Sequence, residues 1–465
     1  MFKYPWTNLH ELNLNWIIQQ VREGLVDHGC VFVRPEDFPD SENPIQDAMD
    51  AAERDNKMVL LSGAYSINTT LEPPENTIII GIENATISTV QDEGLGFAPV
   101  TILNCTSGLY VRGVTFDGNR PEGPSQSTYP SLHPGELVNV NPLVMCWEDV
   151  DGVTFENCTW FNFDGNRSTS NTSALYAALG CYMANNITIR GCYFKDIRLE
   201  CTVFDRCESV RIIDSNFDCG NEAGVYTDIG LLRTNDVIID GCVIHHGDDL
   251  TTSTINAMGD NITIRNCEIT ALKSSHGIDY GNEVAPGLQN SGLYILDNKL
   301  CCHIDPASSS STDHDNIVIA GNVIETPADS TLSGNLMLYA TTPVHYTIRD
   351  NIFIGAAQNA LRCITEGSGA TVEIDGNDFR LRGIRLHGAA DGIIVRNCTF
   401  HDRAVTNTDD YTGETILTMI GCTMLGDIGY QSSNGQVKVV LIGCDLANTV
   451  ATNMHPDITL SYVRV

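Results

Sequence analysis

The sequence is short of basic side chains. Among its 465 residues, 26 Lys and Arg stand against 59 Asp and Glu, and the formal net charge is −33. A chain of this charge repels the phosphate backbone of nucleic acids, which excludes DNA and RNA from its expected partners. It repels polyanionic sugars for the same reason, unless Ca²⁺ or a local basic pocket intervenes. The charge also has a simpler explanation, because it keeps a large surface soluble.

The sequence also lacks long apolar runs and export signals. No apolar stretch approaches the length of a membrane-spanning helix, so insertion into a membrane is not expected. Residues 1–6 lack the basic start and apolar core of a secretory signal peptide, and we expect synthesis in a reducing cytoplasm. The 17 cysteines include no Cys-x-x-Cys pair of zinc-site spacing. They are therefore expected to stay free, and neither a metal ion nor another cofactor is predicted.

What the sequence does contain is an internal repeat. One eight-residue phrase occurs thirteen times: apolar, any, apolar, any, Gly/Asn/Asp, Cys/Asn, any, apolar. ITIRGCYF from Ile187 and ITIRNCEI from Ile262 are two examples, and after the first copy the steps run from 21 to 34 residues. The residues at the sixth position are Val114, Cys158, Cys192, Ser215, Cys242, Cys267, Asn298, Asn322, Asn351, Asn377, Cys398, Cys422 and Cys444.

A period of this length is one coil of a β-solenoid made of short strands and tight bends. Alternating apolar side chains point inward, and coils stacked about 4.8 Å apart enclose one continuous core. The sequence therefore predicts an all-β fold, a single-stranded right-handed parallel β-helix over residues 91–465, and it resembles the pectate-lyase-like superfamily in this respect. The sixth-position residues are predicted to stack in one interior row, with Cys acting as a small hydrophobe and Asn bonding to neighbouring coils.

Residues 26–90 are predicted to form a capping leader. Pro44–Ala52 has the pattern of a short amphipathic helix, and Met58–Leu61 that of a strand. The segment resembles the start of pectate-lyase-superfamily proteins, in which a helix covers the open end of the solenoid. A cap is physically required, because the first coil otherwise exposes an apolar cross-section and unpaired strand edges.

Residues 1–25 carry too many apolar side chains for a free, solvated tail, including Leu12, Leu14, Trp16, Ile17 and Ile18. One interpretation is a first helix packed on the cap, and another is a peptide that docks on a second protein. The segment resembles the opening of appendage and tail-spike proteins of phages that infect gut bacteria. That resemblance implies attachment to a virion protein, a location in the phage particle and a homotrimeric assembly.

Acidic residues and a histidine gather in three successive coils, at Asp228, Asp248, Asp249 and His276. Matching strand to strand places Asp228 level with Asp249, with His276 one coil further along. Neighbours in adjacent coils lie about 5 Å apart and diagonal ones further, which brackets the carboxyl separations of retaining and inverting glycosidases. Crowded carboxylates also raise the pKa of one member, as a general acid requires.

These residues resemble three motifs of the polygalacturonase family of glycoside hydrolases. By that resemblance Asp248 is the general acid, Asp228 and Asp249 position the attacking water, and His276 supports the acid or the substrate. The family's fourth motif, an Arg-x-Lys that binds the substrate carboxylate, is missing. Its absence and the acidic chain argue against polygalacturonate and favour a neutral or weakly acidic glycan.

Other interpretations of the acidic turns stay open. They can be solvated turns, or metal sites at His245, His246, Asp248 and Asp249 or at residues 313–315. The resemblances imply a phage tail spike or appendage that recognises a bacterial surface polysaccharide, with or without hydrolysing it. The alternatives are a non-catalytic structural or receptor-binding spike and a free bacterial polygalacturonase-like glycosidase.

Overall fold

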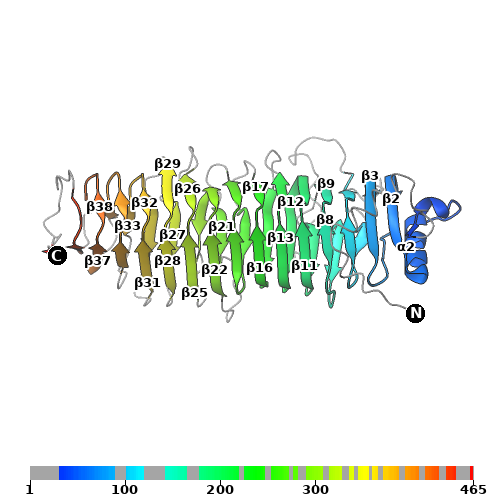
Figure 1. Cartoon of the computed structure of the whole chain (residues 1–465), viewed down its shortest axis with the longest axis horizontal. Helices are drawn as coiled ribbons and strands as arrows, with labels where there is room; N and C mark the ends of the chain where they lie inside the picture. Colours follow the sequence, from blue (N-terminus) through cyan, green and yellow to red (C-terminus); the bar gives the residue numbers. More distant parts are fainter. Residues whose placement is uncertain are drawn as a thin grey trace, which may run out of the picture.

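The computed structural model describes most of the chain as a single stack of coils. The described residues are 31–89, 101–119, 142–164, 177–218, 225–246, 253–271, 276–280, 290–306, 314–326, 335–339, 344–355, 359–364, 370–386, 393–407, 414–428, 436–446 and 461–463. The strands stack side by side along one long axis, and the sequence progresses steadily from one end of the stack to the other (Figure 1). The strand pairings are parallel throughout the described stack, which confirms the predicted right-handed parallel β-helix.

Each coil contributes strands to three rows, of which the first two belong to sheet A and the third to sheet B. The first row consists of β5 (Tyr110–Arg112), β8 (Thr154–Glu156), β11 (Asn185–Arg190), β13 (Glu208–Ile213), β16 (Asn235–Asp240), β19 (Ile262–Arg265), β22 (Asn290–Leu296), β25 (His314–Ala320), β28 (His345–Arg349), β31 (Thr371–Asp375), β34 (Ile393–Arg396), β37 (Glu414–Ile420), β39 (Gln436–Ile442) and β40 (Ser461–Val463).

The second row follows the first after a sharp two-residue bend. The third follows the second after a connection of variable length, which is absent within β12 and a single residue between β23 and β24. The second row consists of β6 (Thr115–Asp117), β9 (Thr159–Asp164), the start of β12 (Tyr193–Asp205), β14 (Asn216–Asp218), β17 (Val243–His246), β20 (Glu268–Ala271), β23 (Lys299–Cys301), β26 (Val323–Thr326), β29 (Ile352–Gly355), β32 (Asp378–Phe379), β35 (Thr399–Phe400) and β38 (Thr423–Met424). The third row consists of β4 (Leu103–Asn104), β7 (Val144–Trp147), β10 (Ala177–Tyr182), the end of β12, β15 (Val225–Leu232), β18 (Ile255–Ala257), β21 (His276–Tyr280), β24 (His303–Asp305), β27 (Leu336–Tyr339), β30 (Leu361–Ile364), β33 (Ile384–Leu386) and β36 (Val405–Asn407).

The recurring phrase forms the first row, the bend and the start of the second row. Its third residue stacks in unbroken register from Val111 through Ile239 and Ile348 to Leu441. Its fifth residue makes the bend and takes a left-handed conformation in every copy, with φ between 49° and 70°. Only Gly, Asn and Asp tolerate that conformation readily, which is why these three residue types recur at this position.

The sixth position of the phrase forms the predicted interior row, and all thirteen residues there are at most 4% exposed. In the Asn block, Asn298, Asn322 and Asn351 each donate from Nδ2 to Oδ1 of the next Asn at 2.9–3.0 Å. Each also donates to a main-chain carbonyl of the preceding coil, as Asn351 does to Ile319 at 2.8 Å. These bonds satisfy the amides in an interior where an unpaired polar group is costly.

The thiols of this row act as small apolar groups, as predicted. The described cysteines are free, and all but the half-buried Cys301 are buried. Burial has the same consequence for a thiol outside this row: it raises the pKa of the Cys363 thiol in sheet B to about 12, so that this thiol stays protonated and unreactive at neutral pH.

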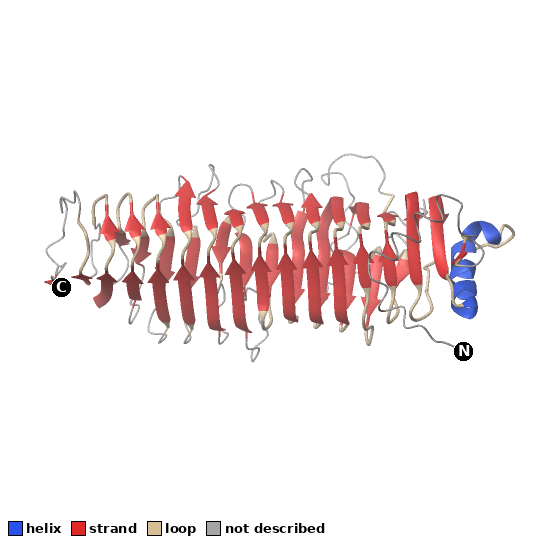
Figure 2. Ribbon diagram, viewed as in Figure 1, coloured by secondary structure: helices blue, strands red, loops and turns tan. Residues whose placement is uncertain are grey.

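The predicted cap is present at the N-terminal end of the stack. There η3 (Pro35–Asp37) and α2 (Pro44–Asp55) accompany β1 (Phe32–Val33), β2 (Met58–Ile67) and β3 (Ile78–Thr89), and the helix lies at the open end (Figure 2). The helix starts at Asn43, whose side chain accepts a hydrogen bond from the Gln46 amide at 3.3 Å, and it ends at Asn56 in the left-handed conformation. Its buried face turns five residues inward: Ile45, Ala48, Met49, Ala51 and Ala52.

Residues 1–25, the predicted docking segment, lie outside the described part of the chain. Among the described residues no helix has the length and apolar character to cross a membrane.

Candidate functional site

The outer face of sheet B carries a continuous line of side chains. In nearly all of its strands an aliphatic residue at one level, such as Ile229, Ile255 or Ile278, belongs to the main core, so the next residue points outward. We call this line the outer row. Its members, in register from coil to coil, are Asn104, Met145, Gly180, Val203, Gly230, Asn256, Asp279, Asp305, Met337, Arg362 and Arg385.

Two carboxylates meet in the middle of the outer row. Asp279 of β21 and Asp305 of β24 are direct register partners, so their backbones lie about 4.8 Å apart. Asp279 is 0% exposed and Asp305 is 3% exposed. Ser253 donates from Oγ to Oδ2 of Asp279 at 3.1 Å. Neighbouring buried carboxylates are unusual in a chain whose other acids mostly face water, which marks this place as a candidate site.

A histidine flanks the carboxylates. His303 is 4% exposed and lies two residues before Asp305, on the same outward-facing side of β24. The adjoining rung contains Asn335, whose side chain accepts a hydrogen bond from Thr326. We call Ser253, Asp279, His303 and Asp305 the carboxylate–histidine cluster.

The cluster contains the groups that glycosidic bond hydrolysis requires. One carboxyl group can donate a proton to the leaving oxygen while a second attacks the sugar or orients a water. Carboxylates on adjacent rungs suit the distance between the two catalytic carboxyl groups of retaining glycosidases, which is shorter than that of inverting ones. Asp279 and Asp305 are almost fully buried, so a sugar at the surface does not contact either carboxylate in this structure.

The residues predicted to be catalytic are only partly described. Asp248 and Asp249 lie outside the described residues. Asp228 lies in β15 and His276 begins β21, but the structure describes the backbone alone at these two positions. His276 pairs with His303, which brings the predicted histidine next to the carboxylate–histidine cluster. The catalytic role of these four residues stays a prediction.

The strand matching that placed Asp228 level with Asp249 is wrong. Ile229, the residue after Asp228, pairs with Ile255, so Thr254 occupies the level of Asp228 in the next coil. The error arises because the connection between β17 and β18 is longer than the matching assumed.

The sequence analysis did not single out Asp279, His303 and Asp305. A signal for them exists, because His276-Gly277-Ile278-Asp279 is followed one coil later by His303-Ile304-Asp305. Each of these two segments begins with His and ends with Ile-Asp. Once the register is known, that recurrence predicts that the two aspartates stack.

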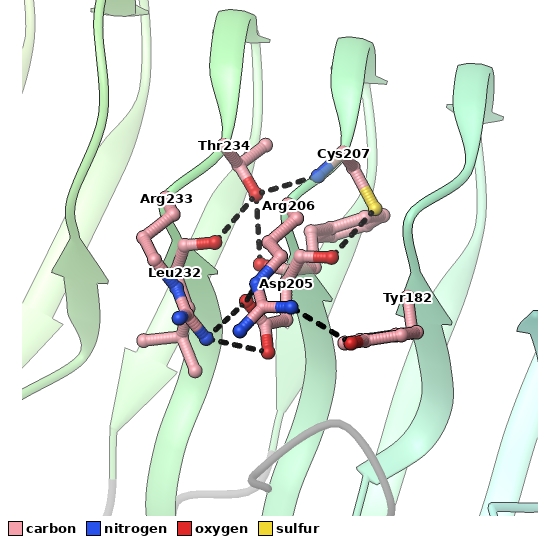
Figure 3. Close-up of polar contacts among 8 residues, drawn as sticks. Tyr182, Asp205, Arg206, Cys207, Leu232, Arg233 and Thr234 are labelled. Atoms are coloured by element: carbon pink, nitrogen blue, oxygen red, sulfur yellow. Dashed lines mark hydrogen bonds and ion pairs between the residues drawn. The ribbon is translucent and has the colours of Figure 1, made fainter. Parts of the chain in front are cut away.

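A second polar group of residues lies at the C-terminal ends of β10, β12 and β15 in sheet B, nearer the N-terminal end of the stack (Figure 3). Arg233 binds both carboxylate oxygens of the buried Asp205 from Nη2, at 2.7 and 2.9 Å. Arg206 donates from Nη1 to the Tyr182 hydroxyl at 2.9 Å, and its guanidinium lies 5.5 Å from the centre of that ring. The Tyr182 ring stacks on Trp147 with centroids 4.6 Å apart. These contacts tie four coils together, and they are primarily structural because the Asp205 carboxylate is buried and both its oxygens accept from Arg233.

The described residues include no group of three or more His, Cys, Asp or Glu side chains arranged to hold one metal ion. Of the two metal sites considered from the sequence, Asp248, Asp249 and Asp313 lie outside the described residues. His245 is exposed on β17, whereas His246 is 1% exposed.

Comparison with known proteins establishes the fold and leaves the family open. No family model and no curated protein matches the chain. A mutant tailspike protein of the E. coli bacteriophage HK620 aligns with a TM-score of 0.52 and 11% sequence identity, over 91% of this chain and 76% of that one. At this identity the likeness concerns the fold alone.

Two further structures align less well. The Dettilon tailspike protein aligns with a TM-score of 0.40 and 15% identity over 79% of this chain, which spans 66% of that protein. DFA-IIIase from Arthrobacter chlorophenolicus A6 aligns with a TM-score of 0.44 and 13% identity, over 83% of this chain and 95% of that one. The chain is a parallel β-helix protein that shares its fold with the HK620 tailspike protein.

Proposed function

We propose that the protein is a spike or appendage of a phage particle that binds a bacterial surface polysaccharide along the outer row of sheet B. The observation that carries the proposal is the part of the outer row that reaches the surface, where the partly exposed Met337, Arg362 and Arg385 occupy successive rungs of a rigid and evenly spaced line. Polar groups held on rigid elements are what the recognition of a sugar requires. The fold shared with the HK620 tailspike protein supports the proposal at the level of the fold.

We further propose that the spike hydrolyses the glycan it binds. Two sets of residues are candidates for this activity. The resemblance to polygalacturonases implies Asp248 as the general acid, with Asp228, Asp249 and His276 assisting. The carboxylate–histidine cluster, with Asp279 and Asp305, is the second set.

A non-catalytic, receptor-binding spike is the second candidate function. The observation that favours it is the burial of Asp279 and Asp305, which keeps both carboxylates away from solvent. In that case the glycan binds the partly exposed members of the outer row, and the buried pair does not react.

One experiment separates these functions. The purified full chain is incubated with envelope polysaccharide from candidate host bacteria, and both retention and the release of reducing ends are measured. Hydrolysis predicts that Asp248→Asn, or else Asp279→Asn or Asp305→Asn, abolishes release while glycan binding persists. Glu325→Gln, an exposed acid on sheet A, is the matched control. Binding without release from the wild type supports the non-catalytic spike, and the absence of binding to any bacterial glycan contradicts the proposal.

We also propose that residues 1–25 attach the spike to the virion and that the spike is a homotrimer. Deletion of residues 1–22 then leaves a folded β-helix that no longer joins the particle. Sedimentation of the truncated chain measures the assembly, and particle association measures the attachment. A truncated chain that still joins the particle would show that the anchor lies elsewhere.

A further inference from the structure

The outer surface of sheet A carries an apolar cluster at the N-terminal end of the stack, where β2 and β3 lie (Figure 1). In β1, β2 and β3 the side chains of Val33, Val59 and Ile79 belong to the main core, so the residues beside them point outward. Four of these outward residues pack together, and we call them the outer cluster: Phe32, Met58, Leu60 and Ile80. The strands are thus apolar on both faces, as parallel strands are when both faces are covered.

The outer cluster is buried although it faces outward. Its four members are at most 3% exposed. By contrast, Ile238 and Ile394 point outward from the same sheet in later coils and are only half-buried. The described apolar residues that pack against the cluster are Val31, Ile78, Ile82 and Tyr110. These residues directly precede β1 or lie in β3 and β5, so they border the cluster without covering its outer side.

The apolar surface ends where the same lines of outward side chains become polar. Along the stack Ile80 is followed by Arg112 and then by Glu156. Tyr110 donates from its hydroxyl to Oε2 of Glu156 at 2.7 Å, and Arg112 Nε lies 3.6 Å from Oε1 of the same carboxylate. From β1 to β5 there are three steps of about 4.8 Å, so the apolar surface is about 14 Å long.

The chain enters this surface at Val31. The Val31 carbonyl accepts a hydrogen bond from the Met58 amide at 3.0 Å, and the Val31 side chain packs against the outer cluster. Residues 1–30 are therefore tethered at the edge of the cluster. A segment on so short a tether has an effective concentration on the order of millimolar at the cluster, which favours it over a separate partner or a second copy.

Residues 14–21 have an apolar pattern that fits the cluster. Leu14, Ile17, Ile18 and Val21 have the i, i+3, i+4, i+7 spacing of one helical face. A helix rises about 1.5 Å per residue, so this stripe is about 11 Å long, close to the length of the apolar surface. Residues 22–30 can extend over about 30 Å, which is enough to return the chain from such a helix to Val31.

An apolar surface open to water is unfavourable, and a helix packed on it removes apolar area from water on both partners. We propose that residues 14–21 form a helix whose apolar stripe packs on the outer cluster. The helix adds a second layer outside sheet A and fixes the N-terminal segment to the first coils. Only the stripe takes part in this packing, so the residues before Leu14 stay available to a second protein. The packing is independent of the proposed phage function.

Methionine oxidation tests whether the outer cluster is covered, because peroxide converts a thioether to its sulfoxide only where it reaches the sulfur. Met58 belongs to the outer cluster, Met49 belongs to the main core, and Met183 is 43% exposed. The full chain is treated with hydrogen peroxide, and mass spectrometry follows the sulfoxide content of each methionine. Met183 and Met49 give the fast and slow limits of the rate.

Two double variants with the same added charge are compared with the wild type. Ile17→Asp/Ile18→Asp places two carboxylates in the stripe, and the control Gln19→Asp/Gln20→Asp places them on the opposite side of the helix. We expect Met58 to be oxidised on the order of 10-fold faster in the stripe variant than in the wild type and the control, because a charged stripe does not stay buried. An unchanged rate at Met58 in the stripe variant overturns the proposal.

A peptide of residues 9–23 tests the same contact when it is added to the stripe variant. The wild-type peptide should restore slow oxidation of Met58, whereas the same peptide with Ile17→Asp and Ile18→Asp should not. Restoration also shows that the coils of the stripe variant are intact, since an unfolded cluster would not bind the peptide. Oxidation of Met58 that stays fast at millimolar wild-type peptide contradicts the proposal.

Other occupants of the outer cluster give different results. If a second copy of the chain covered it, Met58 of the wild type would be oxidised faster on dilution, and the stripe variant would stay protected at high concentration. If a separate protein of the particle covered it, Met58 would be oxidised quickly in the purified wild-type chain. Either result overturns the packing of residues 14–21 on the outer cluster and leaves the proposed function untouched.

Discussion

The inside and the outside of the coils follow different rules. Inside, thirteen successive residues at one position are small, apolar or amide side chains, and all are buried. Outside, the outer row of sheet B changes from glycine to carboxylate to methionine to arginine within a few rungs. The residues of an interior row must pack against the residues directly above and below them, whereas an outward side chain mainly contacts solvent or ligands. Stability should therefore depend on the interior and function on the exterior.

The largest effect on stability is expected from Trp160. This side chain is 0% exposed and stacks on Phe194 with centroids 4.6 Å apart. Trp160→Ala should lower the free energy of unfolding by about 3–5 kcal/mol, because the cavity cannot close in a rigid stack. Chemical denaturation measures the change. Trp147→Ala, on the outside of the preceding coil, is the control, and an equal loss there would break the distinction between inside and outside.

Asn351 tests the interior polar row. It donates to Ile319 at 2.8 Å and to Asn377 at 3.0 Å, and its own Oδ1 accepts from the Asn322 amide at 3.0 Å. Asn351→Ala leaves these buried groups without partners and should cost about 2–4 kcal/mol, measured as a lower thermal midpoint. Asn235→Ala, which removes one exposed acceptor of the Asp260 amide at 2.9 Å, is the control. A loss of similar size in the control would refute the special role of the buried row.

Asp205 lies between the interior and the exterior of the coils, because its carboxylate is buried but its arginine partners reach the surface. Asp205→Asn should destabilise by about 1–2 kcal/mol through the weakened contact with Arg233 at 2.7 Å, and denaturation would detect it. The more exposed Asp378→Asn serves as the comparison. If Asp378→Asn lowered the free energy of unfolding more than Asp205→Asn, burial would not explain the contribution of Asp205.

The smallest effect is expected at the surface pair formed by Lys299 and Glu268, whose charged atoms are 2.6 Å apart. The hydrogen bond from Lys299 holds the pKa of the Glu268 carboxyl below its usual value, so any stabilisation exists at neutral pH and is lost as the pH falls through that lowered pKa. Lys299→Gln should leave the thermal midpoint at neutral pH unchanged within error, because exposed pairs contribute little. A clear drop in the thermal midpoint would show that exterior charge pairs contribute more to stability than we expect from the difference between interior and exterior.

The fold was predictable because its information is local. The bend residue, the alternating apolar positions and the stacked row lie within eight consecutive residues, and thirteen copies report the same geometry. The helix α2 was predictable from its own amphipathic pattern between Asn43 and Asn56. All the copies indicate the same coil geometry, so misreading one of them would not have changed the predicted fold.

The candidate site was less predictable because it depends on the connections between strands. Ile229 pairs with Ile255 and Ile255 with Ile278, so successive strands of sheet B are separated by 26 and then 23 positions. A shift of one residue in such a connection turns a side chain from outside to inside. The neighbours of Asp228 could therefore not be derived from spacing.

By itself the sequence determined the architecture of this protein: the stacked coils, the cap, the free thiols and the interior row of Asn and Cys. These features follow from short-range sterics and from the burial of apolar side chains, which one coil already encodes. The tertiary structure alone decided which outward side chains become neighbours, and so brought Asp279 to Asp305 and Arg362 to Arg385. Those encounters depend on the lengths of the connections between strands, which set the register of each coil on the next and are not encoded in any single repeat.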